Sequence, residues 1–244
     1  MYQHALIIHS DYSKGQRIAL HKACEDLEGI KEFVSLNSKL REKFKELVFS
    51  FHHIQTVDKG VESISEYDSF FDGIEFYSDF DQFVDLVKED IAIKPTDIAK
   101  LILSKGEFSN LEIQKLLYFA YCEYYKMYNE DMFLEDFEAW KYGPVIPDMY
   151  YSLNKYKDRK IKDCKENDTF LEMYSRMIKV SDYDKLAKTV DKTIENYGKM
   201  TIGELLDEAH CTGGPWDEIY KDGEGQNETI PKGLIKKYVK ENRQ

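Results

Sequence analysis

The feature that most constrains the fold is a long apolar helix, predicted to run from Leu111 to Tyr125. Apolar residues recur along it at helical spacing on two adjacent lines, which is the pattern of a helix buried on most of its sides. Ser109 and Glu112 have the spacing of a capping box, in which each side chain accepts a hydrogen bond from the backbone N–H of the other residue. Other elements have to surround such a helix, so we expect it at the centre of a core.

A rigid aromatic segment follows this helix after a polar connector. Trp140, Tyr142, Pro144 and Pro147 lie within eight positions, and Gly143 allows a tight turn among them. Alternation just before the turn predicts a short strand, and Pro147 suits the first turn of a further helix because proline loses no needed N–H there. We therefore expect a short β-hairpin followed by a helix.

Three sequence blocks occur in order between Pro95 and Gln244. They read IQKLLYFAY, then FEAWKYGPVIPDMY, then ELLDEAHCTGGPWDEIY, the last followed by TIPKGLIKKYVKE. Together they resemble the Panacea domain, also called the SocA-like or DUF4065 domain. The resemblance implies an antitoxin of a bacterial or prophage toxin–antitoxin system, which neutralises a cognate toxin by direct protein–protein interaction. It does not extend to residues 1–94.

The resemblance also assigns candidate residues, as a fold signature or as the partner-binding site: Gln114, Lys115, Tyr118, Glu138, Trp140, Lys141, Tyr142, Gly143, Pro144, His210, Pro215 and Trp216. The WKYGPV segment is either the central brace of the fold or part of the face that contacts the toxin, and both interpretations stay open. The third block departs from the family pattern, because two glycines separate Thr212 from Pro215.

Charge and composition limit the function classes. A formal net charge of −12 in 244 residues disfavours general nucleic-acid binding, which needs a basic face, and favours a basic protein partner. No apolar run approaches the ~18 to 20 residues of a membrane helix, and no signal segment opens the chain, so we expect a cytoplasmic protein. The four cysteines lack a CxxC pair, which indicates reduced thiols and neither a disulfide framework nor a zinc ribbon.

The N-terminal module, residues 1–94, has to be interpreted without the resemblance. We expect a strand over Ala5 to His9, a helix from about Gln16 to Leu27, and one bent or two short helices from Ile30 to Phe51. His52 and His53 would then end a helix and make a poor metal site. Lys94-Pro95 is the expected domain boundary. The predicted fold class is mainly α, with a helical Panacea-like domain over residues 95–244 after a small module that is α+β or mainly helical.

Acidic and aromatic residues alternate between Glu62 and Asp90. Within this stretch we expect a strand at Gly73 to Tyr77 and a helix over Phe80 to Ile91 capped by Ser78. One interpretation is a solvated acidic face over an aromatic core, and the other is an acidic surface that binds a basic partner. The candidate partner-binding residues are Glu66, Asp68, Asp72, Glu75, Asp79, Asp81 and Asp85.

The remaining elements of the second part are predicted from local signals. Thr96 can cap a short helix that ends at Gly106, Ser181 starts a helix that ends at Gly198, Thr201 and Glu204 form a second capping box, and Pro231 starts the last helix. Between them lies a charged surface loop whose basic cluster, expected to pair with the chain's own carboxylates or those of a neighbour, is Lys155, Lys157, Arg159, Lys160 and Lys162.

A catalytic interpretation would rest on His210 and Cys211 beside Asp207 and Glu208. Sequence neighbours are seldom oriented toward one another, and the sequence has no nucleophile elbow, metal-ligand repeat or phosphate-binding glycine loop. We therefore interpret His210 as a hydrogen-bonded structural histidine and expect no catalytic residue, metal or cofactor.

Two other functions stay open. The first is an adaptor that presents another protein to a protease or to host machinery, including a phage protein that blocks a bacterial defence. The second is a hydrolase or transferase acting on nucleotides through His210. A DNA-binding regulator is disfavoured because no basic recognition helix is visible. The expected partner is a toxin encoded by an adjacent gene, and a homo-oligomer is also open.

Overall fold

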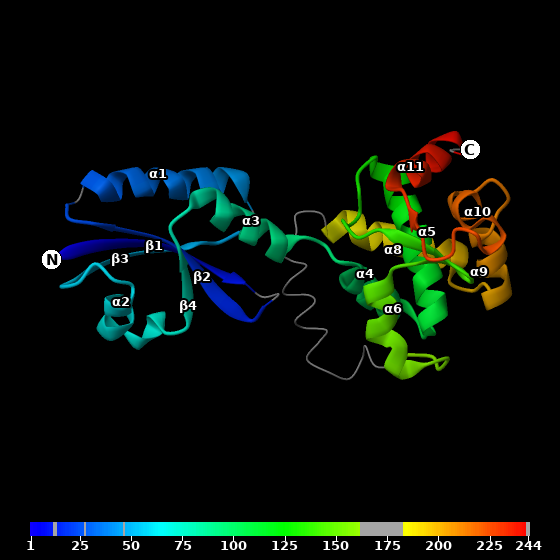
Figure 1. Ribbon diagram of the computed structural model, residues 1–244, viewed down its shortest axis with the longest axis horizontal. Helices are drawn as coiled ribbons and strands as arrows, with labels where there is room; N and C mark the ends of the chain where they lie inside the picture. Colours follow the sequence, from blue (N-terminus) through cyan, green and yellow to red (C-terminus); the bar gives the residue numbers. More distant parts are fainter. Residues whose placement is uncertain (12–13, 27, 46, 162–182, 243–244) are drawn as a thin grey trace. The chain divides into compact units, whose positions relative to one another are not determined.

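The computed structural model describes residues 1–11, 14–26, 28–45, 47–161 and 183–242. Within these residues the chain forms two compact units, one over Met1–Ala92 and one that begins at Ile93 (Figure 1). A mainly α class with β elements is confirmed, since helices dominate and the strands fall into two sheets. No helix among the described residues is long and apolar enough to cross a membrane.

The first unit is built on a four-stranded sheet with the order β3-β1-β2-β4. Strand β1 (Tyr2–Asp11) pairs antiparallel with β2 (Gln16–Cys24) and with β3 (Ser50–Thr56), whereas β4 (Ile74–Tyr77) runs parallel to β2. Ile7 lies opposite Leu20 on β2 and opposite Phe51 on β3. The outer strands β3 and β4 are therefore the two edges of this sheet.

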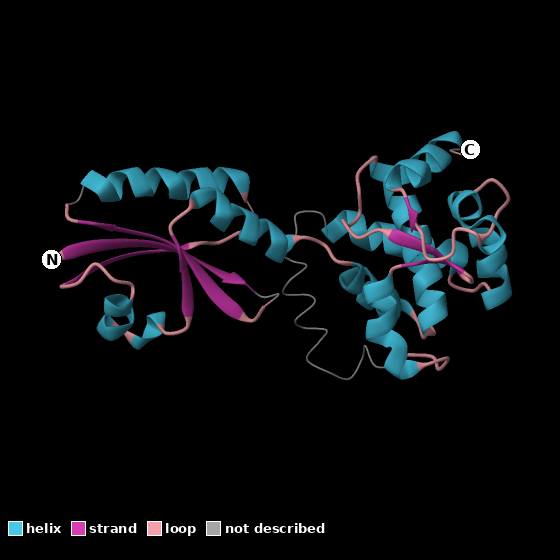
Figure 2. Cartoon of the chain, viewed as in Figure 1, coloured by secondary structure: helices cyan, strands magenta, loops and turns pink. Residues whose placement is uncertain are grey.

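Helices cover both faces of this sheet (Figure 2). Alternate residues of a strand point to opposite faces, so Ile7 and Ile8 enter different cores. Ile7 packs in the core that includes α1 (Glu28–Lys43) and α3 (Phe80–Ile91). Ile8 packs in the core that includes α2 (Glu62–Tyr67) and the 3₁₀ turn η1 (Ser69–Phe71).

Two predictions for the first unit are wrong. The helix expected from Gln16 to Leu27 is strand β2, whose Ile18, Ala19 and Leu20 are all buried because helices cover both sides of it. The helical pattern does give α1, but its last part is strand β3. His52 and His53 accordingly point to opposite faces of the sheet. The His52 ring lies 5.4 Å from Phe71, and His53 Nε2 lies 2.8 Å from Gln3 Oε1.

The acidic stretch contains the predicted strand and helix, with one difference. The strand is β4 and the helix is α3, as expected. The cap is Asp79 rather than Ser78, because the Asp79 carboxylate accepts a hydrogen bond from the backbone N–H of Gln82 over 2.7 Å. The carboxylate is therefore a structural group at the start of α3.

In the second unit, the predicted central helix is α5 (Asn110–Tyr128), and its Ser109–Glu112 capping box is confirmed. Helices and strands surround it (Figure 1). The other described elements of this unit are α4 (Pro95–Lys105), β5 (Phe137–Trp140), β6 (Gly143–Val145), α6 (Pro147–Leu153), η2 (Asn154–Tyr156), α8 (Tyr183–Tyr197), α9 (Ile202–Ala209), α10 (Pro215–Tyr220), η4 (Lys221–Gly223), β7 (Thr229–Ile230) and α11 (Lys232–Glu241). Of these, α4, β6, α6, α8, α9 and α11 pack directly against α5.

Local signals predicted most of these elements. The hairpin of β5 and β6, the helix that starts at Pro147, and the Thr201–Glu204 capping box are confirmed. Strand β7 adds a third strand to the hairpin, in the order β6-β5-β7. Helix α4 begins at Pro95 after Lys94, so Thr96 is not its cap. The predicted helix start at Ser181 and the basic residue Lys162 lie outside the described residues.

Candidate functional site

Two buried polar side chains on α5 hold the tip of the β-hairpin. The fully buried Lys115 amine donates a hydrogen bond from Nζ to the Pro144 carbonyl oxygen over 2.7 Å. Next to it, Gln114 Oε1 accepts a hydrogen bond from the backbone N–H of Ile146 over 3.0 Å. Burial lowers the pKa of Lys115 well below its ordinary value of 10.5. These two bonds fix the strand β6 segment against the central helix.

Gly143 fits the narrow space between two nitrogen atoms at this tip. Its φ angle is +90°, in a region that residues with a side chain rarely adopt. A Cβ atom at this position would lie 2.8 Å from Lys115 Nζ and 3.1 Å from His210 Nε2. Only glycine therefore meets both the backbone and the space requirement.

Three stacked rings close the far side of the hairpin. The His210 ring lies 3.8 Å from the Trp216 ring at an interplanar angle of 11°, and Trp216 stacks in turn on Tyr220 at 4.4 Å. The Trp216 indole N–H donates to the Trp140 carbonyl oxygen over 2.9 Å. Through this bond the tryptophan of α10 is attached to the strand that carries Trp140.

The interpretation of His210 as a hydrogen-bonded histidine is wrong for its Nε2 atom, which has no hydrogen-bond partner among the described residues. Desolvation lowers the pKa of His210, and the nearby Lys115 lowers it further. The neighbouring Cys211 thiol lies 3.1 Å from the Tyr238 hydroxyl. The suspected base and nucleophile thus have different surroundings, a ring stack for one and a hydroxyl for the other.

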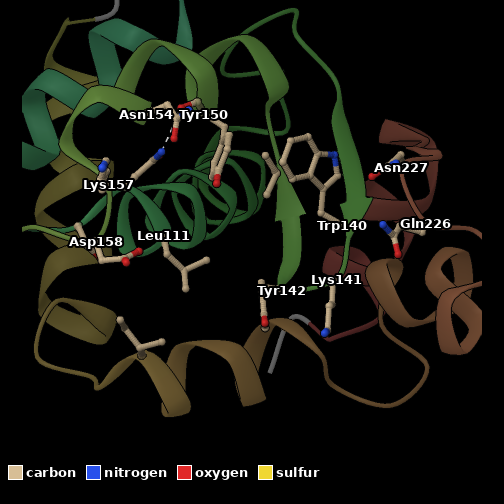
Figure 3. A pocket seen from close by; sticks show the side chains of 14 residues that line it. Leu111, Trp140, Lys141, Tyr142, Tyr150, Asn154, Lys157, Asp158, Gln226 and Asn227 are labelled. Carbon is tan, nitrogen blue, oxygen red and sulfur yellow. Dashed lines mark hydrogen bonds between the residues drawn. The ribbon is translucent and has the colours of Figure 1, made fainter.

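An open cleft of about 660 Å³ lies beside the exposed side of the hairpin (Figure 3). The residues that line it come from the start of α5, the hairpin, α6, the segment after α6, α9 and the loop before β7. They are Ser109, Asn110, Leu111, Trp140, Lys141, Tyr142, Val145, Tyr150, Asn154, Lys157, Asp158, Ile202, Gln226 and Asn227. The cleft therefore collects side chains that are far apart in the sequence.

Aromatic rings cluster at this cleft. The Trp140 ring lies 5.0 Å from Tyr150 and 6.0 Å from Tyr151. The Trp140 indole N–H donates to Glu138 Oε2 over 2.8 Å, which fixes the ring, and Lys141 Nζ lies 5.4 Å from the centre of the Tyr142 ring. Tyr142 and Tyr151 keep 54% and 62% of their surface exposed. Large rings are thus held in place and remain available to a partner.

Comparisons with known proteins identify this unit. The family model of the SocA-like antitoxin Panacea domain matches residues 113–217. Antitoxin SocA of Caulobacter vibrioides (strain NA1000 / CB15N) is 30% identical to the chain over 166 residues, which cover 64% of this chain and 85% of that protein. The chain belongs to the SocA-like Panacea domain family. No solved structure matches it.

The candidate residues that the family resemblance assigns divide into a buried group and a group at the surface. The buried or half-buried group is the brace around the hairpin tip, and consists of Gln114, Lys115, Tyr118, Gly143, Pro144, His210, Pro215 and Trp216. The remaining four, Glu138, Trp140, Lys141 and Tyr142, are partly or fully exposed. The WKYGPV segment therefore contributes to both groups: Trp140, Lys141 and Tyr142 lie at the cleft, whereas Gly143 and Pro144 are buried in the brace. Val145 is buried and also lines the cleft.

Sequence reasoning missed several residues of the cleft. Tyr150 lines the cleft, and the neighbouring Tyr151 lies 6.0 Å from the Trp140 ring. Both follow Pro147 on α6, and this pair of adjacent tyrosines is the signal that could have marked them. Gln226 and Asn227 lie in the loop before β7 and reach the cleft because the backbone N–H of Asn227 donates to the Ala139 carbonyl oxygen over 2.8 Å. Such a contact between distant loops leaves no pattern in the sequence.

The seven acidic candidates of the first unit are all exposed but have different roles. Asp68 accepts a hydrogen bond from the backbone N–H of Phe70, and Asp79 caps α3. Glu75 accepts from the Tyr77 hydroxyl, and Asp85 accepts from Lys88. The remaining three, Glu66, Asp72 and Asp81, make no side-chain hydrogen bond or ion pair with a described residue. These three are the best candidates for contact with a partner.

The basic cluster is partly used within the Panacea domain. Lys160 Nζ lies 2.6 Å from Glu112 Oε1, which confirms that a lysine of this cluster pairs with one of the chain's own carboxylates. Lys157 lines the cleft beside Asp158. Among the described residues, no three His, Cys, Asp or Glu side chains come close enough together to hold a metal ion.

Proposed function

We propose that this protein is an antitoxin that acts in the cytoplasm and neutralises a cognate toxin, encoded by an adjacent gene, through direct binding. The observation that carries the proposal is the arrangement of the Panacea signature, whose buried half braces a hairpin that presents aromatic rings at an open cleft. The relative's name, Antitoxin SocA, supports the same function. We also propose that residues 1–94 and 95–244 are separate domains.

The aromatic cluster has the composition of a protein-binding hot spot. Tryptophan and tyrosine dominate such hot spots because they bury much area and lose little conformational entropy. Trp140 is held by Glu138 and by the rings of α6, so it needs little rearrangement before a partner binds. We therefore place the toxin-contacting face at Trp140, Tyr142, Tyr150 and Tyr151.

Charge supports a second contribution from the first unit. The whole chain carries a net charge of −12, and Glu66, Asp72 and Asp81 have exposed carboxylates that no described side chain neutralises. Such a surface attracts a basic toxin and raises the rate of association. In this proposal the cleft supplies most of the affinity and the acidic surface steers the encounter.

A non-catalytic mechanism fits the surroundings of His210. Its ring stacks on Trp216, its Nε2 atom faces the crowded Gly143 position, and the adjacent Cys211 thiol contacts Tyr238. A general base needs its proton acceptor within reach of a substrate, and the open cleft is lined by other residues. We therefore assign His210 to the brace.

The test is co-expression of the chain with the product of its adjacent gene, with growth and complex formation scored together. We expect the wild type and the control variant Leu134→Ala, which alters an exposed residue (77%) that does not line the cleft, to restore growth and form a stable complex. Trp140→Ala should lose both while its circular dichroism stays that of the wild type. Direct neutralisation would be refuted if the product of the adjacent gene is not toxic, or if growth is restored without formation of a complex.

A further inference from the structure

Strand β3 is an edge of the first sheet that lacks the usual protection. The eleven residues 47–57, LVFSFHHIQTV, contain no Lys, Arg, Asp, Glu, Pro or Gly, although one residue in three along the chain is charged. Exposed edge strands present unpaired backbone N–H and C=O groups, and proteins normally block them with charged residues, proline or a bulge. The β3 edge has none of these residues.

The opposite edge of the same sheet shows the protection that β3 lacks. Strand β4 is only four residues long, carries Glu75, and lies between Asp72 and Asp79. All three carboxylates are exposed. A second strand approaching this edge would meet several negative charges at once, so the two edges differ sharply in their ability to pair.

The ends of β3 add exposed apolar surface. Val48 and Val57 flank the strand and are 91% and 82% exposed. Ser50, His53 and Gln55 are also exposed along the strand, so a neighbouring backbone could approach it. Within the described residues β3 pairs with β1 alone. Exposed valines at both ends of an uncharged strand are costly in a monomer and become useful when another strand covers them.

We propose that β3 is a self-association site, at which a second copy of this chain adds its own β3 in antiparallel orientation. The strand is self-complementary in this orientation. With His53 at the centre of the pair, Phe51 of one copy lies opposite Gln55 of the other, and Val57 lies opposite Phe49. No formal charge lies opposite a like charge within β3, which matters for a chain of net charge −12.

The same geometry limits the assembly to two copies. An antiparallel pair of identical edges is related by a two-fold axis, so both β3 edges are paired when the dimer forms. The joint sheet then has the two protected β4 edges at its ends, and further copies are excluded. Because one pair of seven-residue strands buries little surface, we expect a weak dimer that forms in the micromolar range.

The experiment is analytical ultracentrifugation of the full chain from low to several hundred micromolar. We expect the mass to rise from the monomer value of 28.8 kDa toward twice that value. His53→Lys places two lysines opposite each other and should weaken the dimer at least about tenfold. Gln82→Lys adds the same charge at an exposed position on α3 and should leave the dimer unchanged. If His53→Lys fails to fold, Gln55→Lys replaces it, because it places a lysine opposite the apolar Phe51 at two points of the proposed pair.

Hydrogen exchange locates the contact. The amides of β3 that point away from β1 should exchange more slowly as the concentration of wild-type chain rises, while those of β4 should not change. A chain that stays monomeric throughout would overturn the proposal, and so would a dimer that His53→Lys does not weaken. Protection of β3 only after the toxin is added would assign this edge to the toxin and would equally overturn self-association.

Discussion

The amine of Lys115 and the carbonyl oxygen of Pro144 lie 2.7 Å apart and join the central helix α5 to strand β6 of the hairpin that borders the aromatic cleft. The lysine side chain is fully buried there. A long cationic side chain is seldom placed in a core unless its head group is bound, because desolvation of the charged form is costly. The contact therefore connects the stability of the brace to the shape of the proposed binding face.

Lys115→Met should destabilise the protein by about 1–3 kcal/mol, because it keeps the apolar stem and leaves the Pro144 carbonyl oxygen without its donor. Urea unfolding measures the free energy of unfolding. The matched control is Lys141→Met, which alters an exposed lysine and should stay within about 0.5 kcal/mol of the wild type. A variant as stable as the wild type would mean that desolvation of the amine cancels the hydrogen bond.

The same lysine predicts a pH dependence. Burial lowers the pKa of Lys115 in the folded state below 10.5, so between the lowered pKa and 10.5 the unfolded chain binds more protons than the folded chain. Stability must then rise with pH across this interval. Between neutral pH and just below 10.5, the free energy of unfolding of the wild type should increase relative to that of Lys115→Met. Parallel curves for the two proteins would show that the lysine does not titrate differently on folding.

Gly143→Ala should be more harmful than the same change at Gly213. Both glycines have positive φ, +90° and +72°, so both substitutions strain the backbone by about 1 kcal/mol or more. Only at Gly143 would the new methyl group approach Lys115 and His210, whereas nothing lies within 4 Å of a Cβ at Gly213. Thermal unfolding of both variants separates the effect of crowding from that of backbone strain. Equal decreases in melting temperature would contradict the tight fit at Gly143.

His21 gives the first unit its own acid sensitivity. Burial, and next the neighbouring His4, lowers the pKa of His21 from 6.5 to about 4 in the folded state. As the pH falls from 6.5 toward 4, His21 binds a proton in the unfolded chain but not in the folded chain, so the free energy of unfolding decreases. The loss amounts to roughly 1.4 kcal/mol per unit of pKa difference. His21→Gln should reduce the change in the free energy of unfolding between pH 6.5 and 4. The control His53→Gln, at an exposed histidine, should leave this pH dependence unchanged.

Some elements of the fold depend on local features of the sequence, and others depend on packing between distant segments. Helix α5 could be predicted because its cap, its periodicity and its length are all local features of residues 109–128. Strand β2 could not, since its two covered faces bury Ile18, Ala19 and Leu20 in succession and erase the alternation of a half-exposed strand. From Leu47 into β3, the spacing of Leu47, Phe51 and Ile54 by four and three residues imitates a helix.

The candidate site divides in the same way. The motif residues Lys115, Gly143 and Trp216 could be found from the sequence, but the hydrogen bonds and ring stacks that place them in one brace depend on the folded chain. The cleft was missed because its lining comes from six separate segments. A motif search therefore finds the brace more easily than the surface that the brace supports.

Tyr142 and Tyr151 should be binding residues with little effect on stability. They are 54% and 62% exposed, so truncation to Ala should change the free energy of unfolding by no more than about 0.5 kcal/mol. Because we propose these rings as hot spots, each truncation should weaken the complex with the toxin by more than about 1 kcal/mol, or roughly fivefold in Kd. Calorimetric titration of the purified toxin measures this, with Leu134→Ala as the control. Unchanged affinity in both variants would move the contact face away from the cleft.

The acidic surface should be tested only at carboxylates that the fold does not need. Asp79 caps α3, so its replacement by Ala should cost about 1 kcal/mol and would confuse binding with folding. Reversal to lysine is therefore proposed at Glu66, Asp72 and Asp81. This triple variant should keep the stability of the wild type, bind the toxin more weakly at low salt, and lose most of the salt dependence.

The control for this reversal carries the same charge change on the Panacea domain, at Glu218, Glu224 and Glu241, which are exposed and do not line the cleft. If attraction depends only on net charge, both triple variants weaken toxin binding equally, because each changes the charge by the same amount. If the first unit directs the toxin, the variant in that unit loses more affinity and more of its association rate. Equal losses of affinity in the two triple variants would contradict a specific role for the acidic surface. The aromatic cleft would then be the sole contact that we propose.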